Sequence, residues 1–116
     1  MTLYTIYHNP RCSKSRQTLE LLTRRGIEPD VVEYLKAPLS VLALQTLVQK
    51  LGVPVIDIMR TKEPEFKELG LSNLEVTDDH LLQAIAKNPI LLERPIVVRG
   101  DKAVIGRPPE NVLELI

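Results

Sequence analysis

The N-terminal part of the sequence carries a strand–helix–strand pattern, and this pattern restricts the possible folds more than any other feature of the chain. Residues Thr2 to Tyr7 are rich in β-branched and aromatic residues, which is typical of a strand. Ser13 to Arg25 has the spacing of a helix and ends at Gly26, while Asp30 to Leu35 predicts a second strand. A βαβ unit of this size implies two parallel strands joined by a right-handed crossover.

The rest of the sequence changes from a helical block to a hairpin and a final helix. The expected segments of the block are Val41 to Leu51 with Ser40 as N-cap, Val55 to Arg60, Glu63 to Leu69, and Asp78 to Lys87 with Thr77 as N-cap. The expected tail is a hairpin of Ile96 to Arg99 and Ala103 to Ile105 around Gly100-Asp101, followed by a helix from Glu110 to Ile116. These elements predict an α/β fold in a single domain of residues 1–116.

The composition argues against several classes of protein. Fifteen basic and fifteen acidic residues give a formal net charge of zero, so no basic field favours binding to nucleic acid. Aromatic residues make up only 3% of the chain, which leaves no stacking platform for single strands. No apolar run approaches the roughly 20 residues of a membrane span. A single cysteine excludes an internal disulfide and fits the reducing cytoplasm, so we expect a cytoplasmic protein that binds neither nucleic acid nor membranes.

The single cysteine, Cys12, stands where the first predicted helix begins. Unpaired backbone N–H groups and the helix dipole stabilise negative charge at such a position. Positive charge nearby in the sequence comes from Arg11, Lys14 and Arg16, with His8 as a further candidate. The thiol should therefore have a pKa below its ordinary value of about 8.5, and the same N–H groups form a cradle for a small oxyanion. The alternative is a buried, inert side chain, as most free cysteines are, but the polar neighbours favour a reactive role.

Two residues near Cys12 could assist it. Ser15 stands three positions on, where a dithiol protein has its second cysteine, so disulfide chemistry here needs an outside thiol. Its hydroxyl could instead hydrogen-bond the thiolate. His8 is a candidate general base or electrostatic partner, or else a loop histidine with only a local hydrogen bond. The other histidine, His80, is expected to be solvated, and no ligand spacing supports a metal site.

Three arginines stand at the ends of predicted segments, namely Arg60, Arg94 and Arg107. Arginine presents a planar fork of donors that suits an oxyanion, so these residues are candidates for an anion site beside the cysteine. The alternative is that each is solvated or forms a weak surface ion pair, as most arginines do. Sequence spacing does not show whether the three converge. Pro95 is expected at the first position of its strand, where a missing N–H is tolerated.

Short motifs spread over nearly the whole chain match one known family. They are His8-Asn9-Pro10, Cys12 with Ser15 and Arg16, Thr18-Leu19-Glu20, Leu69-Gly70-Leu71, Thr77-Asp78-Asp79, Asn88-Pro89-Ile90-Leu91, Arg94-Pro95-Ile96-Val97-Val98 and Gly106-Arg107-Pro108. On these motifs the chain closely resembles the ArsC family of glutaredoxin-linked arsenate reductases. The resemblance implies a thioredoxin-like α/β fold with a helical insertion between its βαβ and ββα parts, in agreement with the order of elements above. It also implies a cis peptide bond before Pro95.

The resemblance further implies a mechanism. Cys12 would attack arsenate, His8 would assist the thiolate, and the oxyanion would be held by Arg60, Arg94 and Arg107. Glutathione, as co-substrate, would then attack the cysteine-bound arsenic, and glutaredoxin would resolve the mixed disulfide as arsenite is released. This reaction needs one cysteine in the protein and no bound cofactor.

A second class of function is a regulator that acts by binding a partner. Spx-type transcriptional regulators are thioredoxin-like proteins that bind RNA polymerase, and they usually carry a Cys-x-x-Cys switch. Ser15 breaks that switch in this chain. The alternative function is therefore an Spx-like partner-binding regulator, or a monothiol redox protein without arsenate turnover. The combination of three arginines with a lone cysteine favours the enzyme.

Overall fold

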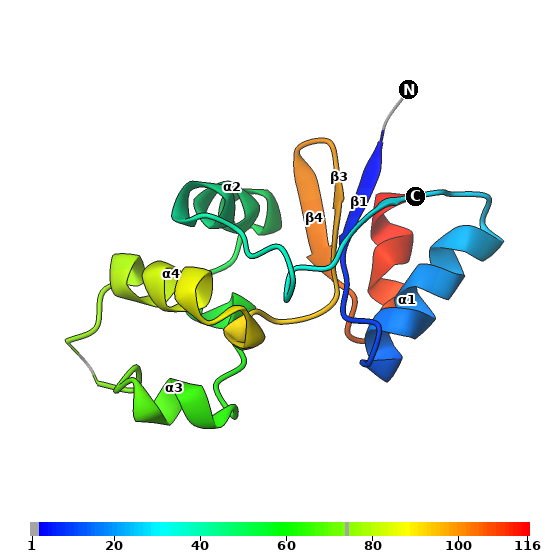
Figure 1. Ribbon diagram of the computed structural model, residues 1–116. Coiled ribbons are helices and arrows are strands. Elements are labelled where there is room, and N and C mark those ends of the chain that lie inside the picture. The colour runs from blue at the N-terminus through cyan, green and yellow to red at the C-terminus, as the bar shows by residue number, and fades with distance from the viewer. Residues whose placement is uncertain (1–2, 74) are drawn as a thin grey trace. The chain divides into compact units, whose positions relative to one another are not determined.

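The computed structural model describes residues 3–73 and 75–116, and the chain divides into two compact units. The first unit combines Met1–Ala37 with Arg94–Ile116, and the second is Pro38–Glu93. The first unit is therefore built from the two ends of the chain. The predicted βαβ and ββα parts fall in the first unit, and the predicted helical block falls in the second (Figure 1).

The first unit contains a four-stranded mixed sheet in the order β2-β1-β3-β4. Its strands are β1 (Tyr4–Tyr7), β2 (Asp30–Val32), β3 (Ile96–Arg99) and β4 (Lys102–Ile105). β1 pairs with β2 in parallel and with β3 antiparallel, so Ile6 stands opposite Val31 on one side and Val97 on the other. The predicted parallel pair and hairpin are confirmed, and the fold is the thioredoxin-like α/β fold. Thr2, which was expected to begin the first strand, lies outside the described residues.

The second strand is shorter than the predicted segment from Asp30 to Leu35, because it ends at Val32. The chain turns there, and the N–H of Lys36 donates to the carbonyl oxygen of Glu33 at 2.9 Å. Tyr34 lies within this turn and is fully buried. The prediction was too long because the residues after Val32 keep the composition of a strand, although their backbone forms a turn and does not pair with the sheet.

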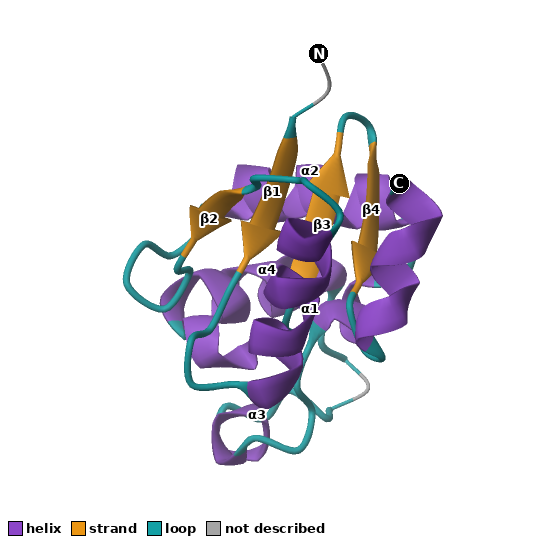
Figure 2. Ribbon diagram, turned by 90° about the vertical axis from the view of Figure 1, so that its right-hand side faces the viewer, coloured by secondary structure: helices purple, strands orange, loops and turns teal. Residues whose placement is uncertain are grey.

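One face of the sheet is covered by α1 (Ser13–Arg24) and by the 3₁₀ helix η3 (Pro109–Leu115), which lie side by side (Figure 1, Figure 2). These two helices and the sheet enclose an apolar core, whose buried residues are Ile6, Leu22, Val97, Val112 and Leu115. The predicted final helix is thus present, but as a 3₁₀ helix that begins at Pro109 instead of Glu110. Proline suits this position because the first N–H groups of a helix have no partner within it.

The second unit is helical, as predicted. Its elements are α2 (Val41–Leu51), η1 (Val55–Ile58), α3 (Pro64–Glu68), α4 (Asp78–Lys87) and η2 (Pro89–Leu91). Both predicted N-caps are confirmed. Ser40 Oγ accepts the N–H of Ala43 at 3.1 Å, and Thr77 Oγ1 accepts the N–H of the exposed His80 at 3.3 Å. Gly52 ends α2 with a φ of 66°, the left-handed conformation that glycine adopts without strain.

The core of the second unit lies around α4, which contacts α2, η1 and η2. Its most deeply buried residues include Leu44, Leu47, Ile58, Ile85 and Leu91. Met59 and Leu92 form an isolated antiparallel bridge beside this core. Within residues 3–73 and 75–116, no helix combines the length and the apolar character needed to cross a membrane.

Candidate active site

Cys12 lies where the turn after β1 becomes helix α1. The N–H of Cys12 donates to the carbonyl oxygen of Asn9 at 3.0 Å, and the N–H of Arg11 donates to the side-chain oxygen of Asn9, also at 3.0 Å. These hydrogen bonds close the turn, and Cys12 follows it with φ −93° and ψ 123°, at the N-cap of α1. Its side chain is partly exposed. The sulfur therefore stands at the positive end of the helix, as the sequence predicts.

The pKa of the Cys12 thiol is lowered from its ordinary value. Burial alone raises this pKa, because the thiolate loses water. Hydrogen bonds from the backbone N–H groups of Ser15 and Lys14, together with the hydrogen bond and positive charge of Arg94, lower it more. The result is a cysteine with an enlarged thiolate fraction near neutral pH, and the thiolate is the nucleophilic form.

The positive charge at the sulfur comes from a different source than the sequence indicated. Arg11 and Lys14 are exposed, and the guanidinium of Arg16 donates to a backbone carbonyl at 3.0 Å. The pKa of His8 is lowered, so this side chain is neutral near pH 7. The cation that lowers the thiol pKa is Arg94. Proximity in sequence was a poor guide to the charge near the sulfur, because the residues around Cys12 lie on different faces of the turn and of the helix.

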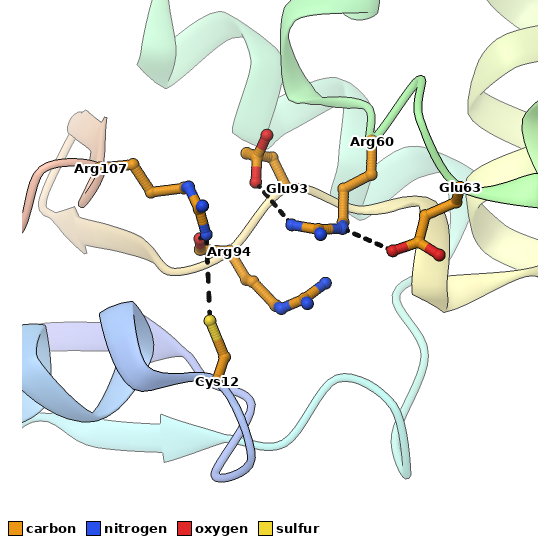
Figure 3. A network of polar contacts seen from close by, with 6 residues as sticks. All are labelled: Cys12, Arg60, Glu63, Glu93, Arg94 and Arg107. Atoms are coloured by element: carbon orange, nitrogen blue, oxygen red, sulfur yellow. Dashed lines mark hydrogen bonds and ion pairs between the residues drawn. The ribbon is translucent and has the colours of Figure 1, made fainter.

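Arg94 and Arg107 both reach the sulfur of Cys12. Arg107 Nη1 lies 3.9 Å from Cys12 Sγ and 3.4 Å from the carbonyl oxygen of Arg94 (Figure 3). The side chain of Arg94 also hydrogen-bonds the thiol. Each arginine precedes a cis proline, at Arg94–Pro95 and Arg107–Pro108. The cis bond before Pro95 is the one that the resemblance implied, whereas the cis bond before Pro108 was not expected.

Tyr34 belongs to this site, although nothing in the sequence singled it out. The side chain is fully buried, and its hydroxyl interacts with the guanidinium of Arg94. Burial lowers the pKa of Arg94, but the Cys12 thiol and the Tyr34 hydroxyl raise it, so that the net shift is upward. In the sequence Tyr34 sits in an apolar run, where a buried tyrosine is ordinary. The only available signal was that a buried tyrosine hydroxyl usually needs a polar partner.

His8 is buried, and its ring contacts Ser15. His8 Nδ1 lies 2.6 Å from Ser15 Oγ, which also accepts the N–H of Asn9 at 3.0 Å. Burial lowers the pKa of His8, and the charge of Glu33 raises it while that of Arg16 lowers it. A neutral imidazole can accept a hydrogen bond from the Ser15 hydroxyl at Nδ1. The Ser15 hydroxyl, a candidate hydrogen-bond donor to the thiolate, joins the turn to His8. The backbone N–H of Ser15 faces the sulfur instead.

Arg60, the third candidate arginine, belongs to the second unit, where it binds two carboxylates. Arg60 Nε donates to Glu63 Oε1 at 3.0 Å, and Arg60 Nη1 donates to Glu93 Oε1 at 3.1 Å (Figure 3). The backbone aligns these groups, because the N–H of Arg60 donates to the carbonyl of Leu91 and the N–H of Glu93 donates to that of Ile58, both at 2.7 Å. A role for Arg60 in holding an oxyanion stays a prediction.

The arrangement in the first unit places a cysteine of lowered pKa beside two guanidinium groups. The thiolate of Cys12 is surrounded by two guanidinium groups and by N–H groups of the first helical turn. Charge-assisted donors of this kind suit a small oxyanion. An oxyanion held there would place its central atom next to the sulfur, so the site can support nucleophilic attack with stabilisation of the charge that develops.

Comparison with known proteins connects this site to one family. The sequence pattern of the ArsC family matches residues 7–115 of the chain. A Haemophilus influenzae protein named arsenate reductase is 52% identical over 112 residues, which cover 96% of this chain and 97% of that protein. An Escherichia coli protein named "Uncharacterized protein YfgD" is also 52% identical over 112 residues, covering 96% of this chain and 94% of that protein.

The three-dimensional comparison agrees with the sequence comparison. The structure titled arsenate reductase from Vibrio cholerae superposes with a TM-score of 0.98 and 50% identity, and the match covers 99% of this chain and 98% of that chain. The family match includes the positions of Cys12, Arg94 and Arg107.

Proposed function

Because the chain belongs to the ArsC family, we propose that it is an arsenate reductase, an oxidoreductase that converts arsenate to arsenite at Cys12. The observation that carries this proposal is the meeting of Arg94 and Arg107 at the sulfur of a cysteine whose pKa is lowered. The names of the similar proteins support arsenate as the oxyanion.

The residues of the site supply the first step of the proposed reaction. Arg94 and Arg107 bind the arsenate oxygens through charge-assisted hydrogen bonds and hold the arsenic beside the sulfur. The Cys12 thiolate attacks arsenic, a sulfur–arsenic bond forms, and one arsenate oxygen leaves as water after it has taken up protons. The two guanidinium groups stabilise the negative charge that moves onto the remaining oxygens.

The reduction itself needs a second thiol. Arsenic gains two electrons on going from As(V) to As(III), and two sulfur atoms lose them when they join in a disulfide. Cys12 is the only cysteine in the sequence, so we assign the second sulfur to glutathione as co-substrate. Its thiol attacks the cysteine-bound arsenic, and a second arsenic oxygen leaves as water. The two sulfur atoms then join in a disulfide as both sulfur–arsenic bonds break, and one bonding pair stays on arsenic, which takes up water and leaves as arsenite. A mixed disulfide between Cys12 and glutathione remains. Glutaredoxin then reduces this disulfide, and the protein itself binds no cofactor in this scheme.

Two further residues enter the proposal with different support. We assign to His8 the role of assisting the thiolate by fixing Ser15, whose backbone N–H faces the sulfur, and the 2.6 Å contact between His8 Nδ1 and Ser15 Oγ supports this role. Arg60 as a third ligand of the oxyanion rests on the family resemblance.

The test is arsenate-dependent oxidation of NADPH in the presence of glutathione, glutathione reductase and glutaredoxin. We expect the rate to require arsenate, glutathione and glutaredoxin, each omitted in turn. Cys12→Ser should abolish turnover and keep the fold, because the two side chains are nearly isosteric. Ser13→Ala, at the exposed neighbouring position, is the matched control and should keep its activity.

The outcomes separate the parts of the proposal. Activity without glutaredoxin would overturn the assignment of the reductant and retain arsenate as substrate. Activity retained by Cys12→Ser would contradict the role of the sulfur. The absence of any arsenate reduction in the complete system would overturn the function and favour the partner-binding regulator, for which pull-down of RNA polymerase subunits is the direct test.

A further inference from the structure

Gly106, which directly precedes Arg107, is enclosed by the side chains of Thr18, on α1, and of Pro95, just before β3. A β-carbon added at Gly106 would lie 2.8 Å from Thr18 Oγ1 and 3.0 Å from both Thr18 Cγ2 and the Cγ of Pro95. The N–H of Gly106 also donates to the carbonyl oxygen of Pro95 at 2.8 Å. The backbone φ of Gly106 is not positive. Glycine is therefore required here by close approach and not by an unusual backbone conformation.

The two side chains that enclose Gly106 have little freedom to move. Thr18 is fully buried on α1, and the ring of Pro95 is almost completely buried. The Thr18 hydroxyl contacts the carbonyl oxygen of Lys14 at 2.8 Å and that of Gly106 at 3.3 Å. A β-branched side chain in a helix has one or two accessible rotamers, and a close-packed interior resists displacement.

This packing lies immediately beside the residues that contact the sulfur. Pro95 follows Arg94 and Gly106 precedes Arg107, and both arginines reach Cys12. Thr18 bonds to Lys14, whose backbone N–H is one of the groups that hold the thiolate. A shift of the Gly106 backbone away from α1 would therefore move a guanidinium group relative to the sulfur.

We propose that Thr18, Gly106 and Pro95 form a clamp that fixes the guanidinium groups of Arg94 and Arg107 at the sulfur of Cys12, so that Thr18 and Gly106 are positioning residues of the anion site. The significance of this clamp for catalysis rests on the proposed function. The clamp itself concerns only the geometry of the thiol and the arginines. The clamp explains the presence of Thr18 and Gly106 in two short motifs of the sequence. The reaction chemistry gives no role to these two residues.

The test measures the anion site without any arsenate turnover. The Cys12 thiol is alkylated with iodoacetamide at increasing sulfate or arsenate, and the anion concentration that gives half-protection is determined. Gly106→Ala should raise this concentration by about tenfold, which corresponds to about 1.4 kcal/mol of lost binding. It should also raise the pH at which alkylation is half-maximal, because Arg94 is displaced from the thiolate.

A second substitution shows whether the loss comes from the clamp. Thr18→Ala removes both Thr18 atoms that crowd the new β-carbon, so Thr18→Ala combined with Gly106→Ala should recover a large part of the lost protection. Thr18→Val combined with Gly106→Ala keeps the branched shape and should not recover it. If Gly106→Ala does not fold, Thr18→Ser is used alone. It keeps Oγ1 and removes Cγ2, and should weaken anion protection by a factor of about two to three (about 0.4–0.7 kcal/mol).

Gly52→Ala is the matched control for a loss of stability alone. Gly52 lies in the second unit with a φ of 66° and has no atom within 4 Å of an added β-carbon, so alanine there strains the backbone without crowding. It should lower the melting temperature and leave anion protection and thiol reactivity unchanged. Native protection in Gly106→Ala, or equal losses in Gly106→Ala and Gly52→Ala, would overturn the clamp. If Thr18→Ala restores anion protection to Gly106→Ala but the unmodified chain does not reduce arsenate, the clamp is retained and only the proposed function is contradicted.

Discussion

At the scale of single residues, the guanidinium of Arg94 has a role that a point charge cannot fill. It lowers the pKa of the Cys12 thiol through a hydrogen bond and its charge, and a fork of donors suits two oxygens of one oxyanion. Arg94→Lys should raise the thiol pKa and lower the rate of arsenate reduction by on the order of 10²-fold. Thiolate absorbance against pH and the coupled assay measure the two effects.

The control for this substitution lies on the same unit. Arg24 is exposed on α1 and pairs with Glu20, so Arg24→Lys should leave both the thiol pKa and the rate unchanged. A normal rate in Arg94→Lys would show that Arg94 supplies charge alone.

The Ser15 hydroxyl contacts two groups, and its removal gives a second prediction at this scale. Ser15→Ala leaves His8 Nδ1 and the N–H of Asn9 without their buried partner. The free energy of unfolding should fall by about 1–3 kcal/mol, as measured by urea titration, with Ser13→Ala as the exposed control. The thiol pKa should rise, because the Ser15 backbone, whose N–H faces the sulfur, is no longer fixed by His8. An unchanged thiol pKa would show that the contact between His8 and Ser15 does not assist the thiolate.

The sequence predicted some of these residues and missed others for a physical reason. Cys12 could be found because its position at a helix start is a local property. Arg94 and Arg107 could be suspected because charged residues stand at segment ends, but their contact with the sulfur depends on tertiary structure. Tyr34 could not be found, because a buried tyrosine looks the same in a sequence whether or not its hydroxyl meets a cation.

At the scale of elements, the helices of the second unit agree with the prediction because their ends are specified locally. The N-cap of α2 is Ser40, and the helix ends at Gly52, as predicted. The prediction was wrong where it depended only on the periodicity of apolar residues, without a capping residue. The strand predicted to reach Leu35 ends at Val32, because a short apolar run is compatible with a buried turn as well as with a strand.

The cap of α2 gives a prediction for the helical unit. Ser40 Oγ accepts the N–H of Ala43 at 3.1 Å, so Ser40→Ala should lower the free energy of unfolding by about 0.5–2 kcal/mol. Gln45→Ala, at an exposed position inside α2, is the control and should not destabilise the chain, because alanine is the best helix former. Both variants should keep the thiol reactivity of Cys12. Equal stability of Ser40→Ala and the unmodified chain would show that α2 does not depend on this cap.

At the scale of the whole chain, the site exists because of the order and register of the strands. β1 and β3 are adjacent and antiparallel, so that Tyr7 at the end of β1 stands opposite Ile96 at the start of β3. Ile96 in turn stands opposite Ile105 at the end of β4. The turn before Cys12 and both arginines therefore lie at the same end of the sheet, where β1 and β4 finish and β3 begins. The sequence predicts the strands, the parallel pair and the hairpin, but neither the pairing of β1 with β3 nor the register, and so it could not predict this meeting.

The pH dependence of the stability follows from two shifted groups in the first unit. The folded pKa of Cys12 is lowered, so its contribution is absent below that pKa and grows until the pH passes the unfolded value of about 8.5. The pKa of His8 is also lowered, so stability is lost as the pH falls below about 6.5 and through the folded pKa of His8. The free energy of unfolding, measured by urea titration across this pH range, should show both the loss in acid and the rise on the alkaline side.

Two variants separate the loss in acid from the rise on the alkaline side. Cys12→Ser should remove the rise on the alkaline side and keep the loss in acid, whereas His8→Gln should do the reverse. A wild-type curve that is flat between neutral pH and about 8.5 would contradict the lowered thiol pKa.

The position of Cys12 at the N-cap of α1 has a consequence for dynamics. The sulfur that reacts is also the group whose pKa is lowered by the backbone N–H groups of the first helical turn. A covalent adduct on the sulfur neutralises the thiolate, and so withdraws negative charge from the end of the helix that favours it. Each chemical state of the cysteine should then have its own degree of fraying at the start of α1. Amide hydrogen exchange at Lys14 and Ser15 should be slowest in the free thiolate and faster after alkylation. The exchange rate at the start of α1 would then report the chemical state of Cys12.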